Sequence, residues 1–369
     1  MPDFTLSPDL VLLQETVRSF AAQELRPRER AAEAARGIDG GVASACETIG
    51  LARLELPESL GGAGLGALAG AIVREELGAG DAGAALALDP LGPVLYALRD
   101  FGGEDALRAF ALPVLEAAGA RAILVFDAMP RIHTEGRRAH GTLPWVPADR
   151  ADLLVVLERE RAYVLRDSIA CEPVRGTGLR AAGASALRIE GSPVLAEWVS
   201  TPCARRTLAH ARLHAAALLV GVMRQAAEFS RRYARDRVAF GRPIAHHQAL
   251  AFLITDMAAA VDAARLLVWE AAWRLDSGLA ADEACASAFV ECAEASMFVA
   301  PNALQILGGH GFMQDHPVEK YLRDARALGL LLGGIDAARD DAERDLLGIA
   351  GPVDLGGDDP QGELHAASS

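Results

Sequence analysis

Histidine and cysteine residues are the first candidates for chemistry, but their spacing does not form a metal site. His210 and His214 are four residues apart and would share one helix face, yet no third ligand or glutamate accompanies them. The adjacent His246 and His247 would point to different faces. The cysteines form no CxxC pair; they are Cys46, Cys171, Cys203, Cys285 and Cys292. We therefore expect no bound metal, and thiols that are small buried groups in a reducing compartment.

A loose dinucleotide-binding fingerprint lies at Gly176-Thr-Gly178-Leu-Arg-Ala181. Such a motif binds a pyrophosphate where it joins a strand to a helix inside a βαβ unit. No strand–turn–helix pattern surrounds this segment. We interpret it as a turn of a β-rich region.

The elements that must position any site change character twice along the chain. Residues 1–118 are predicted to be helical, beginning with Ser7 as N-cap and Pro8 in the first turn. Residues 119–205 contain short β-prone runs such as Leu153-Leu154-Val155-Val156-Leu157, separated by Gly, Pro and Asp. We predict an N-terminal helical domain followed by a small β-barrel domain.

Helical periodicity returns after Arg206 and continues to residue 350. Long apolar helices are expected after Gln248, across Asp282 to Leu307, and from Pro317 to Leu328, with Pro301 splitting or kinking the second. Such helices joined by short turns predict a four-helix bundle, so the fold class is α+β and mainly α. The polar tail 351–369 is predicted to be disordered.

Composition excludes several classes of partner. The 369 residues carry a net charge of -14, so nucleic acid and anionic membrane surfaces would be repelled. No apolar run approaches the roughly 20 residues of a membrane span, and no secretory signal is visible at the N-terminus. We expect a cytoplasmic protein that binds neither nucleic acid nor membrane.

Two segments near the C-terminus carry a resemblance to a known family. The first is Tyr233-Ala-Arg-Asp-Arg-Val-Ala-Phe-Gly-Arg-Pro-Ile-Ala-His-His-Gln248. The second is Ala303-Leu-Gln-Ile-Leu-Gly-Gly-His-Gly-Phe312, followed by His316-Pro-Val-Glu-Lys-Tyr-Leu-Arg-Asp-Ala325. Both resemble the signature segments of acyl-CoA dehydrogenases. The resemblance implies an FAD-dependent oxidoreductase that acts on an acyl-CoA, with an electron-transfer flavoprotein as a candidate acceptor.

The resemblance also implies roles for particular residues. The residues placed along the ADP half of FAD, largely that of a neighbouring subunit, are Arg237, Phe240, Gln248, Gln305, Gly308 and Gly309. Among them Arg237 is expected on the pyrophosphate, where a guanidinium forks onto phosphate oxygens. Arg212 stands where family members place an arginine near bound substrate.

The sequence departs from the family where the chemistry occurs. Family members use a glutamate to remove the α-proton of the thioester while hydride leaves to the flavin. That position falls on Leu332, and the alternative position on an earlier helix falls on Ala211. Neither side chain can accept a proton. Glu228 or Asp127 could substitute, but nothing in the sequence places either near a thioester.

The flavin-binding segments of the β domain also differ. Family Thr and Gln positions beside FAD fall on Gly334 and Asp336. The run Phe126-Asp-Ala-Met-Pro130 leads almost directly to Trp145-Val-Pro147, with much of the family's intervening loop missing. Pro147 replaces a hydroxyl residue and lacks a backbone donor. We expect this chain's own flavin pocket to be impaired.

These features predict a subunit without its own catalytic base, resembling one member of actinobacterial heterotetrameric dehydrogenases that act on lipids such as steroid side chains. Its partner would be a base-bearing acyl-CoA dehydrogenase subunit. Two alternatives stay open. One is a self-sufficient flavin monooxygenase or oxidase of the same fold, and the other is a structural partner that binds neither FAD nor acyl-CoA.

Overall fold

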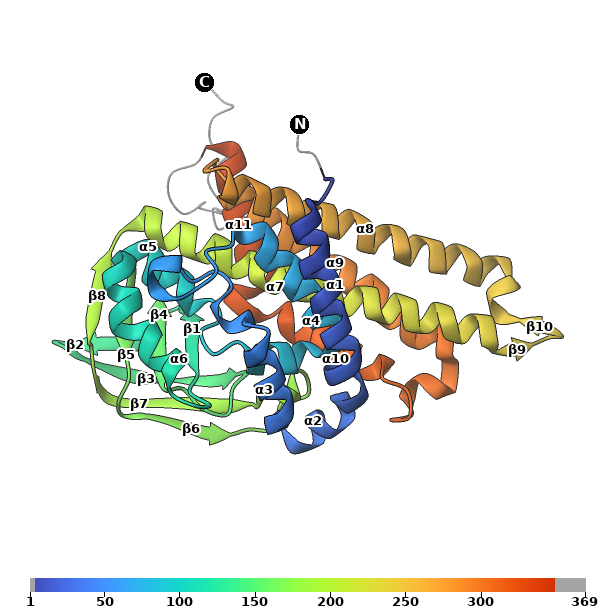
Figure 1. Ribbon diagram of the computed structural model, residues 1–369, viewed down its shortest axis with the longest axis horizontal. Coiled ribbons are helices and arrows are strands. Elements are labelled where there is room, and N and C mark those ends of the chain that lie inside the picture. The colour runs from blue at the N-terminus through green and yellow to red at the C-terminus, as the bar shows by residue number, and fades with distance from the viewer. Residues whose placement is uncertain (1–3, 349–369) are drawn as a thin grey trace, which may run out of the picture.

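The computed structural model describes residues 4–348 and arranges them as helices, then two sheets, then helices again (Figure 1). The predicted disordered tail 351–369 lies outside the described residues. The N-terminal helical elements are α1 (Pro8–Phe20), η1 (Ala21–Leu25), η2 (Arg26–Arg28), α2 (Glu29–Ala35), α3 (Gly40–Thr48), η3 (Leu51–Arg53), η4 (Glu58–Leu60), α4 (Ala67–Leu88), α5 (Val94–Ala106), η5 (Leu107–Ala111) and α6 (Leu112–Glu116).

The predicted start of the first helix is confirmed. Ser7 has an extended backbone, and its hydroxyl accepts the Leu10 N–H at 3.3 Å. Pro8 follows in the first turn, where its missing N–H costs nothing. A helix of ordinary length then buries Val17 and Phe20 against α4.

The middle unit consists of two four-stranded sheets. One has the order β1 (Ala122–Phe126), β4 (Leu153–Leu157), β5 (Arg161–Leu165) and β8 (Ala196–Val199), and only β1 and β4 pair in parallel. The other has the order β2 (Ile132–Glu135), β3 (Arg138–Val146), β7 (Ser185–Pro193) and β6 (Ile169–Pro173). The strands of this unit, β1 to β8, pair as these two separate sheets, so hydrogen bonding does not close the barrel that was expected.

Alternating side chains from both sheets form the core of this unit. Leu154 and Val156 of β4 meet Leu187 and Ile189 of β7. Their neighbours Val155 and Leu157, which point to the opposite face, pack instead with α5. A strand buried on both faces explains why residues 153–157 read as a continuous apolar run.

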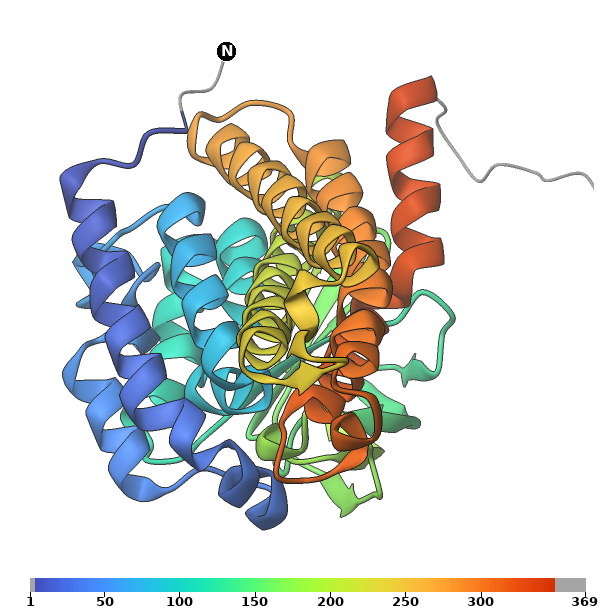
Figure 2. The same ribbon diagram turned by 90° about the vertical axis from the view of Figure 1, so that its right-hand side faces the viewer.

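The C-terminal helices surround α7, the longest helix of the described residues, which spans Thr201–Asp236 (Figures 1 and 2). The remaining elements are β9 (Val238–Ala239), β10 (Arg242–Pro243), η7 (Ile244–His246), α8 (Gln248–Asp276), α9 (Asp282–Leu307), η8 (Gly308–Phe312), α10 (Val318–Leu328), η9 (Leu331–Gly333) and α11 (Gly334–Leu347). Helix α7 packs against α8, α9 and α10 in the expected C-terminal bundle, and also against α4 of the N-terminal helical part.

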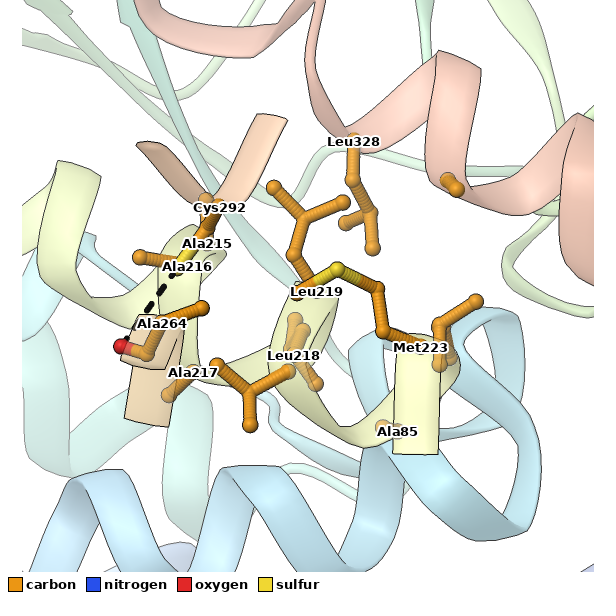
Figure 3. Packing of buried hydrophobic residues seen from close by; sticks show 14 of the residues in the cluster. Ala85, Ala215, Ala216, Ala217, Leu218, Leu219, Met223, Ala264, Cys292 and Leu328 are labelled. Carbon is orange, nitrogen blue, oxygen red and sulfur yellow. Dashed lines mark hydrogen bonds between the residues drawn. The ribbon is translucent and has the colours of Figure 1, made fainter. Parts of the chain in front are cut away.

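Close approach of α4 and α7 depends on two glycines. A Cβ at Gly221 would lie 2.2 Å from the carbonyl oxygen of Glu75, and one at Gly78 would lie 2.6 Å from that of Leu218. Small residues beside them, such as Ala215, Ala216 and Ala217, let α7 sit at the centre of the core (Figure 3). The alanine-rich sequence of α7 is therefore a packing requirement as well as a helix preference.

Two sequence expectations need correction. Pro301 does not split its helix, because α9 continues from Asp282 to Leu307. Packing of α9 against α7, α8, α10 and α11 offsets the loss of one backbone hydrogen bond. Helix α7 begins at Thr201, before the expected 206, because Ser200 caps it by accepting the Cys203 N–H and Pro202 stands in its first turn.

Candidate functional site

Leu332 occupies the turn between α10 and α11. Its φ is 56°, and Gly333 and Gly334 that follow have φ of 89° and 72°. A leucine in the left-handed region is uncommon, and such strained residues gather at functional sites. The Leu332 side chain is half-buried and packs against both the bundle core and the core under β1. This position carries no group that can accept a proton.

Ala211 lies on α7 and is fully buried. Its neighbour His210 faces α5, where its ring stacks on Tyr96 with centroids 4.9 Å apart. The other neighbour, Arg212, is only 2% exposed. Ala211, the second position that the resemblance assigns to the base, thus carries a methyl group that cannot accept a proton.

The two carboxylates that could substitute for the base lie outside the wall of the cavity beside Arg212. Asp127 is buried at the end of β1, and its Oδ2 accepts the N–H groups of Arg131 and Ile132 at 2.8 and 2.9 Å. Glu228 is exposed in a groove between α1 and α8. Neither residue lines the cavity next to Arg212.

Phe126 joins the β unit to the Leu332 turn. A Cβ added to Gly333 would lie 3.3 Å from two ring atoms of Phe126, so the phenyl ring packs directly on this backbone. The guanidinium carbon of Arg159 lies 5.8 Å from the centre of the same ring. The end of β1 and the α10–α11 turn therefore touch through an aromatic side chain.

A cavity of about 370 Å³ lies between the first turns of α7, the β4–β5 turn and α11. Apolar and charged side chains share its wall, which is formed by Phe126, Glu158, Arg159, Glu160, Thr201, Ala204, Arg205, Leu208, Ala209, Arg212, Asp282, Asp341, Arg344 and Asp345. Asp341 of α11 bridges two elements, since Oδ2 meets Arg212 Nη1 at 2.8 Å and Oδ1 meets Arg159 Nη1 at 2.7 Å. This bridge fixes α11 across the cavity.

The residues expected along the ADP half of a cofactor are all exposed. Arg237 directly follows α7, and Phe240 is 95% exposed at the tip of the β9–β10 hairpin. Gln248 begins α8. Gln305 lies in the last turn of α9, and Gly308 and Gly309 follow that helix. Their side chains or backbone are available to a molecule outside this chain.

A hydrogen bond brings the two signature segments together. The Tyr233 hydroxyl and His310 Nδ1 are 2.8 Å apart, which joins the last turn of α7 to η8. His310 also stacks on His316 with ring centroids 5.6 Å apart. Gly308 and Gly309, adjacent to His310, are thus held near the end of α7 that leads to Arg237.

Phe240 is held in a strained conformation. Its φ is 54° and that of Gly241 is 77°, the pattern of a two-residue hairpin turn of type I′. His247 supports the hairpin, since its Nε2 lies 3.3 Å from the Ala239 carbonyl oxygen. An exposed phenyl ring held this way indicates a contact outside the chain.

The cavity and the exposed signature residues lie at opposite ends of α7. The helix has 36 residues and is about 54 Å long at ~1.5 Å per residue. Arg212 lies in its N-terminal third beside the β unit, whereas Arg237 follows its last turn. Figure 1 shows the β9–β10 hairpin projecting at the end away from the sheets.

The remaining candidate motifs carry no ligand set. Within residues 4–348, no group of three or more His, Cys, Asp or Glu residues could hold a metal ion. Burial lowers the pKa of His214 well below its usual value. The Gly176–Ala181 segment lies between β6 and β7 and runs into the short η6 (Arg180–Ala182). Over the same described range, no helix is long and apolar enough to cross a bilayer.

Comparison with known proteins defines the class to which this helical–β–helical fold belongs. Residues 7–117 match the family description "Acyl-CoA dehydrogenase, N-terminal domain", and residues 201–347 match "Acyl-CoA dehydrogenase, C-terminal domain". Cyclohex-1-ene-1-carbonyl-CoA dehydrogenase of Geobacter metallireducens is 30% identical over 89% of this chain and 95% of its own length. The chain belongs to the acyl-CoA dehydrogenase family.

Other relatives agree with this assignment. The short-chain specific acyl-CoA dehydrogenase of Homo sapiens mitochondria is 28% identical, covering 89% of this chain and 87% of the human protein. Butyryl-CoA dehydrogenase from Megasphaera elsdenii has the same fold, with a TM-score of 0.82 and 22% identity over 94% of this chain and all of that one. The resemblance inferred from the signature segments is confirmed.

Sequence reasoning missed two contributors to this region. Asp341, which bridges Arg159 and Arg212, gives no signal because it lies 129 positions after Arg212, in an acidic helix. His310 lies inside a signature segment, but its contact with Tyr233 depends on the fold.

Proposed function

We propose that this chain is the base-lacking subunit of a hetero-oligomeric acyl-CoA dehydrogenase. The observation that carries the proposal is the absence of a titratable side chain at both family base positions, Leu332 and Ala211. A general base must lie within hydrogen-bond reach of the proton that it removes. Asp127 and Glu228 do not line the neighbouring cavity, and Asp341 is already paired with two guanidiniums.

The family implies FAD as the cofactor. The ADP half of FAD fits the residues that follow α7, whereas the flavin half does not fit the β unit. The ADP half fits the exposed residues after α7, because Arg237 offers a forked donor and Gly308 and Gly309 leave the backbone accessible. The flavin half does not fit this chain's own β unit. Phe126 packs directly on Gly333, and Pro147 lacks both a side-chain hydroxyl and a backbone N–H.

This division supports a subunit that serves its neighbour's cofactor. The flavin supplies hydride acceptance when it is bound in the partner, and the partner supplies the glutamate base. This chain then contributes Arg237, Gln305 and the exposed Phe240 to the ADP end, about 37 Å along α7 from Arg212. Such a chain can lose its own catalytic activity and still be required for assembly of the active complex.

The substrate that we propose is a lipid acyl-CoA, of the kind formed from steroid side chains, bound in the partner subunit. An electron-transfer flavoprotein is the proposed acceptor of the electrons. Both assignments rest on the family and on the resemblance to heterotetrameric dehydrogenases. They make this chain part of fatty acid or steroid degradation.

The test is dehydrogenation by the purified chain alone, supplied with FAD, acyl-CoA substrates and an artificial electron acceptor. We expect no turnover, since loss of a general base removes about 10²–10⁴-fold of rate and the flavin site is also impaired. The control is the same assay on the complex with its base-bearing partner, which should be active. If the lone chain turns over substrate and Asp127→Asn or Asp341→Asn abolishes this turnover, the proposal is contradicted and the substituted carboxylate is identified as the base.

A further inference from the structure

His214 lies near the middle of α7 and borders a small internal cavity. The residue is only 4% exposed, and its Nδ1 is buried without a hydrogen-bond partner among the described residues. One side of the ring packs edge-on against Tyr96, with ring centroids 6.5 Å apart. A buried polar atom without a partner is costly, so the imidazole calls for a hydrogen-bonding molecule on its open side.

The cavity beside His214 has a volume of about 30 Å³ and lies between α3, α4 and α7. Its polar lining comes from His214, Arg74, Asp89 and the thiol of Cys46, and the other lining residues are alanine, valine and leucine. Arg74 Nε is a second buried polar atom that has no partner among the described residues. Two unpaired polar groups therefore line one small space.

The charges on the cavity wall are balanced. Arg74 and Asp89 contribute one charge of each sign, with Nη2 and Oδ2 3.9 Å apart. Burial, helped by the nearby Arg74 charge, lowers the pKa of His214 well below its usual value, so its ring is neutral. Burial also raises the pKa of the Cys46 thiol to about 12, so this group is not a thiolate. The wall suits a neutral molecule that can both donate and accept hydrogen bonds.

The size of the cavity restricts that molecule further. A single water needs roughly 10–15 Å³ of such space, whereas drug-sized ligands occupy sites of about 300–1,000 Å³. A volume of about 30 Å³ admits water and excludes a larger organic ligand.

We propose that this cavity is an internal water site, in which an ordered water joins His214 to Arg74 and Asp89. The water accepts the N–H of Arg74 Nε and donates to the Asp89 carboxylate and to the acceptor nitrogen of His214, and about three such bonds are usual for buried water. It extends a polar chain in which Glu55 accepts from Arg74 and from the Tyr96 hydroxyl. Helices α4 and α7 are thereby joined by hydrogen bonds as well as by apolar packing. The site needs neither flavin nor a base, so it goes beyond the proposed subunit role.

The test is a crystal structure of the full chain, alone or in its complex, determined with and without xenon pressure. We expect an ordered water about 2.7–3.2 Å from Arg74 Nε and no xenon in the cavity. The reason is that xenon enters dry apolar cavities, whereas polar cavities of this size hold water. Xenon in this cavity, or a cavity without water density in the xenon-free crystal, would overturn the proposal.

Two substitutions of Cys46 give a matched pair for a measurement in solution. Cys46→Val places an additional methyl group in the cavity, whereas Cys46→Ala leaves more space and keeps the polar partners. Oxygen-17 relaxation dispersion of the solvent counts long-lived internal waters. We expect Cys46→Val to lose about one such water relative to the unmodified chain and Cys46→Ala to keep it.

Equal numbers of long-lived waters in the three folded proteins would contradict the proposal. If Cys46→Val does not fold, the water density beside Arg74 Nε and the xenon experiment on the unmodified chain decide the question.

Discussion

Arg237 is the single residue on which the cofactor assignment depends most. It is exposed, follows the last turn of α7, and its carbonyl accepts the Ile244 N–H at 2.8 Å, which closes the hairpin carrying Phe240. Within the described residues its guanidinium forms no ion pair within 4 Å, unlike Arg18, which is also exposed but pairs with Glu76 at 2.8 Å. An exposed guanidinium next to a hydrogen-bonded hairpin is consistent with a contact to a phosphate group bound in a neighbouring subunit.

Arg237→Ala is expected to weaken flavin retention in the assembled enzyme by about one to two decades in affinity, without unfolding it. The reason is loss of a charge-assisted contact to the pyrophosphate. The measurement is FAD content after dialysis of the purified complex, together with its melting temperature. Arg235→Ala, an exposed neighbour on α7, is the control. Equal FAD retention in both variants would mean that Arg237 is a solvated surface charge that does not contact the pyrophosphate.

Glu29 gives the chain a predictable pH response. Burial raises its pKa to about 7, partly opposed by nearby Lys320, while Asp81 raises it further. Lys320 itself is buried and paired with Asp81 at 3.0 Å and Asp324 at 2.5 Å. Tyr321 and Arg30 also face Glu29 and favour its charged form. The folded chain therefore holds a proton here that the unfolded chain, in which a glutamate has its ordinary pKa of 4.5, would release.

The sign of the effect follows from that proton. Between about pH 4.5 and 7 the folded state holds the Glu29 proton more tightly. The contribution of Glu29 to stability is therefore greatest below this window and falls as pH rises through it, by roughly 3 kcal/mol. Glu29→Gln should flatten this slope and raise stability at pH 8, as measured by denaturant unfolding at several pH values. Glu15→Gln, an exposed change on α1, should leave the slope intact. A slope that survives in Glu29→Gln would assign it to another group.

Whether a residue's role could be predicted from the sequence depends on how far along the chain its contacts lie. The assignment of Leu332 and Ala211 to the family base positions rests only on their spacing from recognisable segments, and it stays a prediction. The sequence does not predict the Arg212–Asp341 pair or the contact of Phe126 with Gly333. Each joins segments that are far apart along the chain, and only the fold brings them together. Local patterns do not encode such contacts.

At the scale of elements, α4 and α7 form the axis on which the helical parts are built. Asp81 interrupts α4 with a non-helical backbone, φ −165° and ψ 114°, and its Oδ1 accepts the Ala84 N–H that begins the next turn. The same carboxylate pairs with Lys320 of α10. Periodicity predicts both helices, but it cannot show this break, because the compensating partner lies 239 positions away.

Gly221→Ala should destabilise the chain, because the added Cβ would approach the Glu75 carbonyl oxygen to 2.2 Å and force α4 and α7 apart. Overpacking of this kind costs about 1–3 kcal/mol. Thermal unfolding of the purified variant should show a lower midpoint. Gly40→Ala, at the open start of α3 with no atom within 4 Å of the new Cβ, should be neutral or slightly stabilising. A midpoint unchanged by Gly221→Ala would mean that the two helices can separate freely.

Some features of the helices and strands are determined by the local sequence, and others by tertiary contacts. Ser7 and Ser200 both act as N-caps, a local signal, although the sequence prediction included only the first. Of the two outcomes expected for Pro301, a split or a kink of α9, the split does not occur, because tertiary packing keeps the helix continuous. The β-prone runs are located correctly, yet their arrangement as two sheets depends on pairings between distant strands such as β3 and β7.

At the scale of the whole molecule, the cavity and the residues proposed for the ADP half of FAD are separated along the long axis. The β unit and the cavity lie at one end of α7, and the residues suited to a cofactor's ADP half lie at the other (Figure 1). One chain cannot bring Arg237 to its own β unit without breaking the helix between them. The exposed Phe240 and Phe312, 95% and 74% accessible, gather at the same end as Arg237 and suit burial by a neighbour.

The central claim is that this chain completes a partner's flavin site and has no functional flavin site of its own. The direct measurement is flavin per protomer, determined with the mass of the complex, after co-expression with a base-bearing relative from the same genome. We expect a colourless chain alone and a yellow heterotetramer with about half the FAD of a homotetramer, since only one subunit type holds flavin. A yellow homotetramer of this chain, with one FAD per protomer, would contradict the account and favour a self-sufficient flavoenzyme.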